Sequence, residues 1–174
     1  MTLGELCAAT LTTSDNTAAN LILASYGGPR ALTAFARSLG DTVTRLDRIE
    51  PALNTWRNAV SDTTSPRAML HGMRRVVLGD ALKPASRELL QQWLRANTTG
   101  DRRLKAGLPA GWTIGDKTGT SANGSHNDIG VVWPPNRPPL LVTAYLARSA
   151  APVEVRDETL AKVGRLLATI VVAA

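Results

Sequence analysis

Apolar residues recur every three to four positions over most of the first 95 residues and again near the C-terminal end. This spacing is typical of amphipathic helices that bury one face. The predicted helices span residues 1–12, 17–23, 29–39, 66–77, 84–94 and 153–172. The fourth helix is expected to bury a stripe made of Met69, Leu70, Met73, Val76 and Val77. The first helix begins so close to Met1 that little room is left for an N-cap.

The period changes to two after residue 111. Alternating residues predict three strands, at 112–121, 128–133 and 140–148. Turns rich in Asn, Gly and Pro join them, so an antiparallel meander is expected. Residues 41–65 show no regular period, and a run of that length in a compact domain is usually functional or mobile.

This order of elements predicts a two-part α+β fold. A helical, all-α part covers residues 1–95, and an α/β part with antiparallel strands and a closing helix covers residues 96–174. The composition, 44% hydrophobic and 20% charged, is typical of a globular protein. A chain of 174 residues is also long enough to bury a substantial core.

The net charge of +6 raises the question of nucleic-acid binding. The basic residues are scattered and no run of five like charges occurs, so we predict no nucleic-acid partner. No stretch reaches transmembrane length, and residues 1–5 lack the basic and apolar regions of a signal peptide. We therefore predict no membrane partner.

The single cysteine, Cys7, cannot form a disulfide within the chain and is expected to be a small buried apolar residue. Two histidines and one cysteine, far apart in sequence, do not have the spacing of a zinc site. We predict no metal and no cofactor.

The most informative stretch is residues 115–121, Gly-Asp-Lys-Thr-Gly-Thr-Ser. Lysine is unfavourable in a half-buried strand unless its charge is used. Thr118 and Thr120 flank Lys117 at alternating spacing, so we expect a row of hydroxyl groups beside an ammonium on one face, and Gly119 allows a ligand to approach the backbone. The pattern suits an anionic substrate lying along the strand; the alternative is an ordinary strand end with a surface lysine.

Two further motifs precede this stretch. Ser14-Asp15-Asn16 follows the first helix, and Glu50-Pro51-Ala52-Leu53-Asn54 lies in the aperiodic region. Ser-Asp-Asn and Lys-Thr-Gly are motifs of class A β-lactamases and penicillin-binding proteins. With all three elements in the family's order, the whole chain resembles about the C-terminal two thirds of a class A β-lactamase.

The resemblance implies hydrolysis of the amide bond of β-lactam antibiotics through a serine acyl-enzyme, on a β-lactamase/transpeptidase-like fold. Ser14 would relay a proton to the ring nitrogen, and Lys117 would hold Ser14 and attract the substrate carboxylate. Asn16 would bind the substrate's acylamide. Thr118 and Thr120 would bind its carboxylate across Gly119, and the Thr120 N–H would supply half of an oxyanion hole.

The same resemblance identifies residues 41–65 as the omega loop. Glu50 and Asn54 would hold the deacylating water, with Glu50 as general base. Arg48 and Asp62 match an ion pair that clamps the loop. Arg103 resembles an arginine that some class A subgroups extend across to the strand motif, where it would help to bind the substrate, although its neighbour Arg102 competes for that position.

One family motif, Ser-x-x-Lys, is absent from the 174 residues, because none of the four lysines follows a serine by three. We therefore expect the nucleophile upstream of Met1 in a longer protein, and an isolated chain that cannot acylate. The resemblance implies an unpaired half-cystine as the alternative to a buried apolar role for Cys7. We also expect an unpaired sheet edge beside residues 140–148, together with exposed apolar faces and poor solubility. Two alternatives remain, a truncated non-catalytic penicillin-binding module and a penicillin-recognising DD-peptidase relative. A complete protein would be monomeric and secreted or periplasmic.

Overall fold

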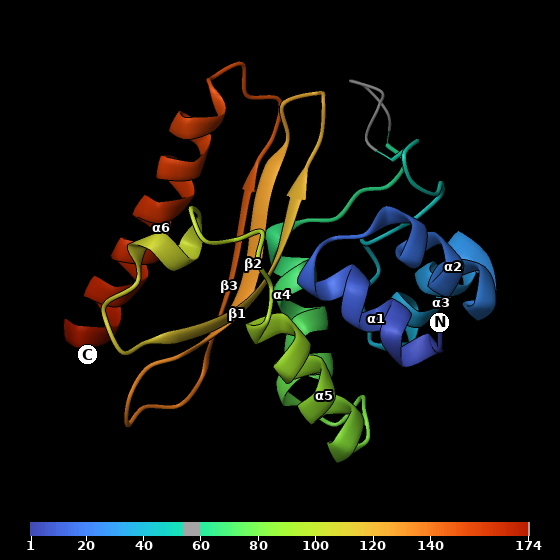
Figure 1. Cartoon of the computed structure of the whole chain (residues 1–174), viewed down its shortest axis with the longest axis horizontal. Coiled ribbons are helices and arrows are strands. Elements are labelled where there is room, and N and C mark those ends of the chain that lie inside the picture. Colours follow the sequence, from blue (N-terminus) through green and yellow to red (C-terminus); the bar gives the residue numbers. More distant parts are fainter. Residues whose placement is uncertain (54–59, 174) are drawn as a thin grey trace.

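The computed structural model describes residues 1–53 and 60–173 (Figure 1). Its α-helices are α1 (Leu3–Thr12), α2 (Asn16–Tyr26), α3 (Gly28–Ser38), α4 (Pro66–Met73), α5 (Pro84–Arg95) and α6 (Val153–Ala173). A π-helical turn, η1 (Arg74–Leu78), continues α4, and a 3₁₀ turn, η2 (Leu104–Gly107), precedes the sheet. The strands are β1 (Thr113–Thr120), β2 (His126–Trp133) and β3 (Leu140–Leu146). The predicted α+β fold class is confirmed.

The three strands form an antiparallel meander in the order β1-β2-β3. Lys117 is opposite Ile129 in the β1–β2 ladder, and Ile129 is opposite Thr143 in the β2–β3 ladder. Successive side chains alternate between the two faces of the sheet. The register therefore decides which residues of β1 share a face with Lys117.

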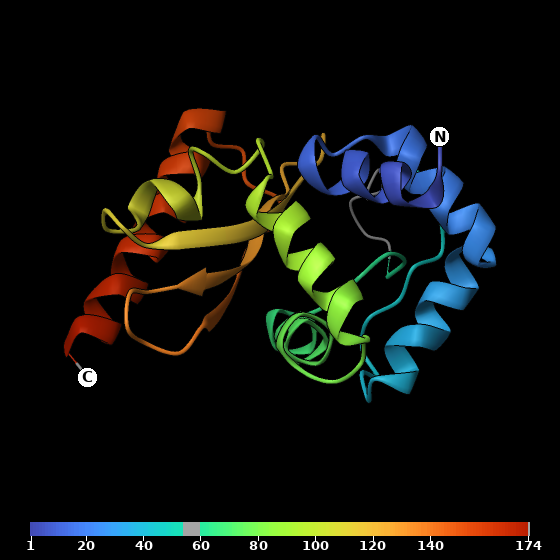
Figure 2. The same ribbon diagram turned by 60° about the horizontal axis from the view of Figure 1, so that its bottom comes forward.

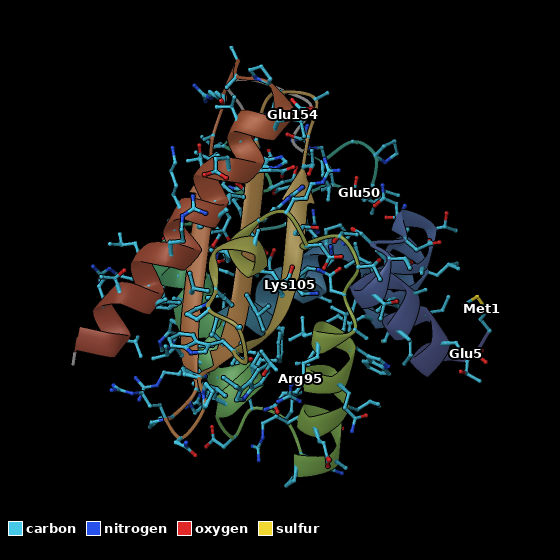
Figure 3. The ribbon with its side chains drawn as sticks, turned by 60° about the vertical axis from the view of Figure 1, so that its left-hand side comes forward. Met1, Glu5, Glu50, Arg95, Lys105 and Glu154 are labelled. Carbon is cyan, nitrogen blue, oxygen red and sulfur yellow. The ribbon has the colours of Figure 1, made fainter. Side chains whose placement is uncertain are left out.

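Helices cover both faces of the sheet (Figure 1). On one face α4, η1 and α5 bury a cluster made of Met73, Val77, Leu94 and Val131. On the other, η2 and α6 bury a cluster made of Leu104, Ile114, Val132, Val142, Ala144 and Leu160. At the end of the sheet, the Arg95 guanidinium stacks 3.6 Å above the Trp133 ring (Figure 3). Both faces of the sheet are therefore packed, and β1 is buried from Ile114 to Asp116, directly before the lysine motif.

Helices α1, α2 and α3 form a separate group beside α5 (Figure 2). Asp15 caps α2, accepting a hydrogen bond from the Ala18 N–H (2.7 Å). Gly27, with φ of 105°, ends α2 and allows α3 to start immediately. The predicted division of the chain at residue 95 remains a prediction, since α5 packs directly on β1.

Three expectations about the helices were wrong. Helix α1 does have an N-cap: Thr2 and Glu5 form a capping box, in which each side chain bonds the other's backbone N–H. Leu70 is exposed rather than buried, because the buried face follows Met73 and Val77, spaced by four residues across the π-helical turn. Cys7 is only partly buried.

The sheet has an open side at β3. In the described part of the chain, no strand pairs with the outer edge of Leu140–Leu146. Apolar side chains are exposed on the C-terminal helix as well, with Leu166 and Ile170 about 60% exposed. No helix among the described residues is long and apolar enough to cross a membrane.

Candidate active site

A pocket of about 480 Å³ lies where the α1–α2 turn, the loop after α3 and the end of β1 meet. Eight of the predicted site residues line it: Ser14, Asn16, Glu50, Arg103, Lys117, Thr118, Gly119 and Thr120. The lining is mainly polar, and it comes from segments that are far apart in sequence. Asn54 lies outside the described residues.

Lys117 joins the strand to the helical part of the molecule. Its Nζ donates to Ser14 Oγ (2.8 Å) and to the Thr118 carbonyl oxygen (2.9 Å). Burial lowers the pKa of Lys117, and the Asp116 carboxylate opposes that effect. Ser14 has a φ of 59°, a left-handed conformation that is unusual for a residue other than glycine. The turn therefore points a hydroxyl oxygen at the ammonium, an arrangement suited to moving a proton.

The expectation that Lys117 shares one face of the strand with Thr118 and Thr120 was wrong. Strand alternation places Lys117 on the face covered by α4 and α5, and its ammonium reaches the pocket around the edge of β1. The two hydroxyl groups are on the other face, where Thr118 Oγ1 lies 2.6 Å from Thr99 Oγ1. The pocket thus receives the cation and the hydroxyls from opposite sides of the strand.

The loop is fixed by polar side chains around Glu50. Asn20 of α2 binds the Glu50 backbone twice, through Nδ2 to the carbonyl oxygen (2.9 Å) and through Oδ1 from the N–H (3.0 Å). Arg48 Nε donates to Asp62 Oδ2 at 2.6 Å, so these two residues close the loop with an ion pair. The Glu50–Pro51 peptide bond is cis.

Burial raises the pKa of Glu50, although the positive charge of Lys117 opposes the shift. A carboxylate with a raised pKa is a stronger base than an ordinary glutamate. In Figure 3, Glu50 lies between the strands and the N-terminal helices. Its position at the pocket wall would allow it to take a proton from a bound water.

Arg103 is 8% exposed and extends under the far end of the pocket. Its NH1 donates to the carbonyl oxygens of Gly119 (3.1 Å) and Asn127 (2.6 Å), and its NH2 donates to Thr120 Oγ1 (2.7 Å). Arg102 is exposed. Of the two competing arginines, Arg103 is the one that lines the pocket.

Sequence reasoning missed several residues that shape the site. They are Asn20, Thr99, His126, Asn127 and Asp157. His126 is 1% exposed and its Nε2 lies 2.6 Å from Asp157 Oδ1, while Arg103 Nε lies 3.4 Å from the same oxygen. These contacts join residues that are 19 to 54 positions apart, so no local pattern in the sequence reveals them.

Among the described residues, no group of three or more His, Cys, Asp or Glu is placed to hold a metal ion. The polar groups of the pocket are hydroxyl, amide, ammonium, guanidinium and carboxylate. Such a set is suited to binding an anion and transferring protons.

Comparison with known proteins agrees with this geometry. The model of the Beta-lactamase enzyme family matches residues 1–171. The chain belongs to the class A β-lactamases. A β-lactamase of Streptomyces albus G is 52% identical over 169 residues, which are 97% of this chain and 54% of that protein. A β-lactamase of Streptomyces fradiae is 51% identical over 169 residues, 97% of this chain and 55% of that protein.

A solved ancestral class A β-lactamase (GNCA) superposes with a TM-score of 0.95 at 57% identity, covering 98% of this chain and 66% of that one. At this identity the class A β-lactamase fold is shared, and so is the order of its elements. The chain spans about half the length of the curated relatives it matches.

Proposed function

We propose that this chain carries the substrate pocket of an enzyme that hydrolyses the amide bond of β-lactam antibiotics through a serine acyl-enzyme, as in antibiotic resistance. The observation that carries this proposal is the 2.8 Å hydrogen bond from Lys117 Nζ to Ser14 Oγ, at the wall of a pocket that also holds Glu50. In acylation, Ser14 would pass a proton to the ring nitrogen as the amide bond breaks. A hydroxyl held by an ammonium suits this step because it accepts and donates at once.

Substrate recognition would use the two sides of the pocket. Asn16 would bind the acylamide side chain on the helical side. Thr118 and Thr120 would bind the carboxylate on the strand side, with Arg103 behind them adding positive charge. The Thr120 N–H would stabilise the oxyanion, and Gly119 leaves room for the substrate against the backbone.

Glu50 would act as the general base that activates water for deacylation, with Asn54 as its amide partner. The raised pKa of Glu50 supports this role, because the carboxylate binds a proton more readily than an exposed one does. Arg48 and Asp62 would keep the loop closed around that water. A base for deacylation distinguishes a hydrolase from a peptidase that penicillin traps as a stable acyl-enzyme.

The acylating serine and its lysine would come from a segment that these 174 residues do not contain, and the chain alone would not acylate. A second cavity of about 350 Å³, lined almost entirely by apolar side chains, has Lys117 on its wall. Such a cavity suits an apolar helix that presents a nucleophile beside the ammonium. The open edge of β3 could pair with further strands of the same segment. The complete enzyme would be monomeric and periplasmic or secreted.

The test is a hybrid in which the residues preceding the matched region of the Streptomyces albus G β-lactamase are joined to this chain. We expect the hybrid to hydrolyse a chromogenic cephalosporin, and the chain alone to show neither turnover nor labelling by a fluorescent penicillin. Replacing Glu50→Gln in the hybrid should preserve labelling and slow deacylation by about 10²–10⁴-fold. Turnover by the unmodified chain, or an unchanged rate in Glu50→Gln, would contradict the proposal.

A further inference from the structure

Two neighbouring strands of the pocket, β1 and β2, each carry a buried aspartate. Asp116 of β1 is 2% exposed and Asp128 of β2 is 0% exposed. Asp128 is opposite Thr118 in the ladder, two residues from Asp116, so both carboxyl groups lie on the same face of the sheet. Each carboxyl group influences the pKa of the other.

The surrounding backbone is built tightly around these carboxyl groups. A side chain on Gly100 would place its Cβ 2.0 Å from Asp116 Oδ2, so a larger residue would displace this carboxyl group. Asp116 Oδ2 accepts from Asn97 Nδ2 (2.7 Å), and Asp128 Oδ2 accepts from the Leu104 N–H (3.1 Å). Asp128 Oδ1 is buried, and no donor reaches it from any described residue. An unbonded carboxylate oxygen in such a place is unfavourable unless a donor reaches it, and a proton between the two carboxyl groups would supply that donor.

The nearby cations form their hydrogen bonds with other groups, although Arg103 still lowers the pKa of Asp128, and Lys105 and Lys117 lower that of Asp116. Lys105 of η2 binds Asp101 at the surface (2.7 Å; Figure 3), and Lys117 binds Ser14 on the opposite face of the sheet. Arg103 directs its NH groups at the pocket edge, and its Nε lies nearest to an oxygen of Asp157.

The remaining titratable groups on this side are paired with each other. On α6, Asp157 is paired with His126 of β2. Burial raises the pKa of Asp116, and burial together with the neighbouring carboxylate raises the pKa of Asp128 to about 8. Two neighbouring negative charges in a buried site repel each other strongly. One proton shared by the two carboxyl groups removes this repulsion and supplies a donor for Asp128 Oδ1.

We propose that Asp116 and Asp128 hold a single proton between them at neutral pH, and that this pair positions the segment from Asn97 to Leu104 against the pocket. The shared proton on Asp116 and Asp128 does not depend on the proposed β-lactam hydrolysis. Only the role of the pair in positioning the pocket rests on that proposed function. Neither aspartate lines the pocket, so both act through other residues.

A chain of hydrogen bonds leads from the pair to the pocket. Because Asn97 donates its amide to Asp116, its Oδ1 faces Thr99 and accepts from both the Thr99 N–H (3.1 Å) and the Thr99 hydroxyl (2.8 Å). The Thr99 hydroxyl proton is thereby used, so Thr118 is the donor in the 2.6 Å contact between the two threonines. The buried pair therefore sets the direction of the Thr118 hydroxyl at the pocket wall.

The test follows the aspartate side-chain ¹³Cγ signals of the full chain from pH 3 to 9, with the exposed Asp80 as reference. We expect one proton to remain on the Asp116–Asp128 pair at pH 7 and to leave only near pH 8. The Thr118 methyl signal should titrate with it, which a merely structural role would not produce. Full ionisation of both carboxyl groups below pH 5 would overturn the proposal, and this outcome is readable in the wild-type chain alone.

Two variants sharpen the test. A folded-state pKa above the unfolded value gives stability that is present at low pH and lost as the pH rises, so the wild-type denaturant midpoint should fall between about pH 4 and pH 8. Asp128→Asn keeps a donor toward Asp116 permanently, so it should flatten this slope and make the Thr118 methyl signal independent of pH. Asp128→Ala should lower the midpoint at every pH in that range. An Asp128→Asn protein with the wild-type slope would refute the shared proton, whereas an inactive hybrid enzyme would refute only the proposed reaction.

Discussion

Strand β1 and the loop at residues 41–65 both deliver residues to the same pocket, but they are held in different ways. Strand β1 has eight residues paired with β2, and α5 packs against it. The loop is held at separate points by side chains: Thr33 at Leu46, Asn20 at Glu50, and Asp62 at Arg48. A substitution in a strand with a continuous backbone ladder lowers the stability of the whole sheet. A substitution at a single side-chain contact destabilises only the loop segment that the contact holds. Substitutions in the two regions should therefore differ in kind.

The largest effect is expected where the strand meets the helix. In Gly115→Ala the new Cβ would lie 2.9 Å from Leu94 Cβ and 3.1 Å from the Arg95 backbone nitrogen, and a helix backbone cannot move aside cheaply. We expect the free energy of unfolding to fall by about 3 kcal/mol, the upper range for overpacking. Urea unfolding followed by tryptophan fluorescence measures this change.

The matched control is Gly72→Ala in α4, where a Cβ meets nothing within 4 Å. A helical Gly→Ala change of this kind should be neutral or slightly stabilising. Equal urea midpoints for the two variants would show that β1 is not rigidly held.

A smaller and local effect is expected at the loop clamp. Asp62→Ala removes the acceptor of the Asp47 and Arg48 N–H groups and of the Arg48 guanidinium, from a side chain that is 2% exposed. We expect about 2 kcal/mol less local stability and about 30-fold faster proteolysis in the loop, with the urea midpoint almost unchanged.

Asp62→Asn is the control for that change, because asparagine retains one acceptor oxygen and tolerates the φ of 56° at this position. The cleavage rate of the Asp62→Asn loop should lie between those of the wild type and Asp62→Ala. If Asp62→Ala shifted the global midpoint as much as Gly115→Ala, the loop would be an integral part of the core and the contrast would fail.

The smallest effect is expected at the second anchor. Asn20→Ala removes two hydrogen bonds to the Glu50 backbone, which is partly open to solvent that can replace them. We expect about 1 kcal/mol of local destabilisation, or roughly fivefold faster cleavage of the loop. Thr17→Ala, on an exposed position of the same helix, should leave the cleavage rate unchanged. Equal rates for the two variants would mean that Asn20 does not anchor the loop.

The helices and strands were predictable because periodicity is a local property of the chain. All three strands were placed correctly, with ends within a few residues. The missed capping box at Thr2 was also readable, since threonine followed three residues later by glutamate is its ordinary signature. That error came from reading the apolar stripe before the polar signal.

Only those site residues that belong to a sequence motif could be predicted. Ser14 and Lys117 stand in motifs, and the structure places them in contact. Asp116 lies inside the lysine motif, yet nothing local shows that Asp128 lies beside it, because that contact depends on the register between two strands. The pairing of His126 with Asp157 similarly depends on how α6 packs across the sheet. The face on which Lys117 lies follows from alternation, but the route of a long side chain around the strand edge does not.

The contact between Ser14 and Lys117 joins residues separated by 103 positions. A ribosome adds about 5–20 residues each second, so roughly 5–20 s pass between the synthesis of the serine and that of its partner. During that interval the first three helices exist without the strand that completes the pocket, while the sheet itself, a meander of neighbouring strands, can form soon after its last residue emerges. The polar centre of this molecule can therefore form only after about two thirds of the chain has been synthesised.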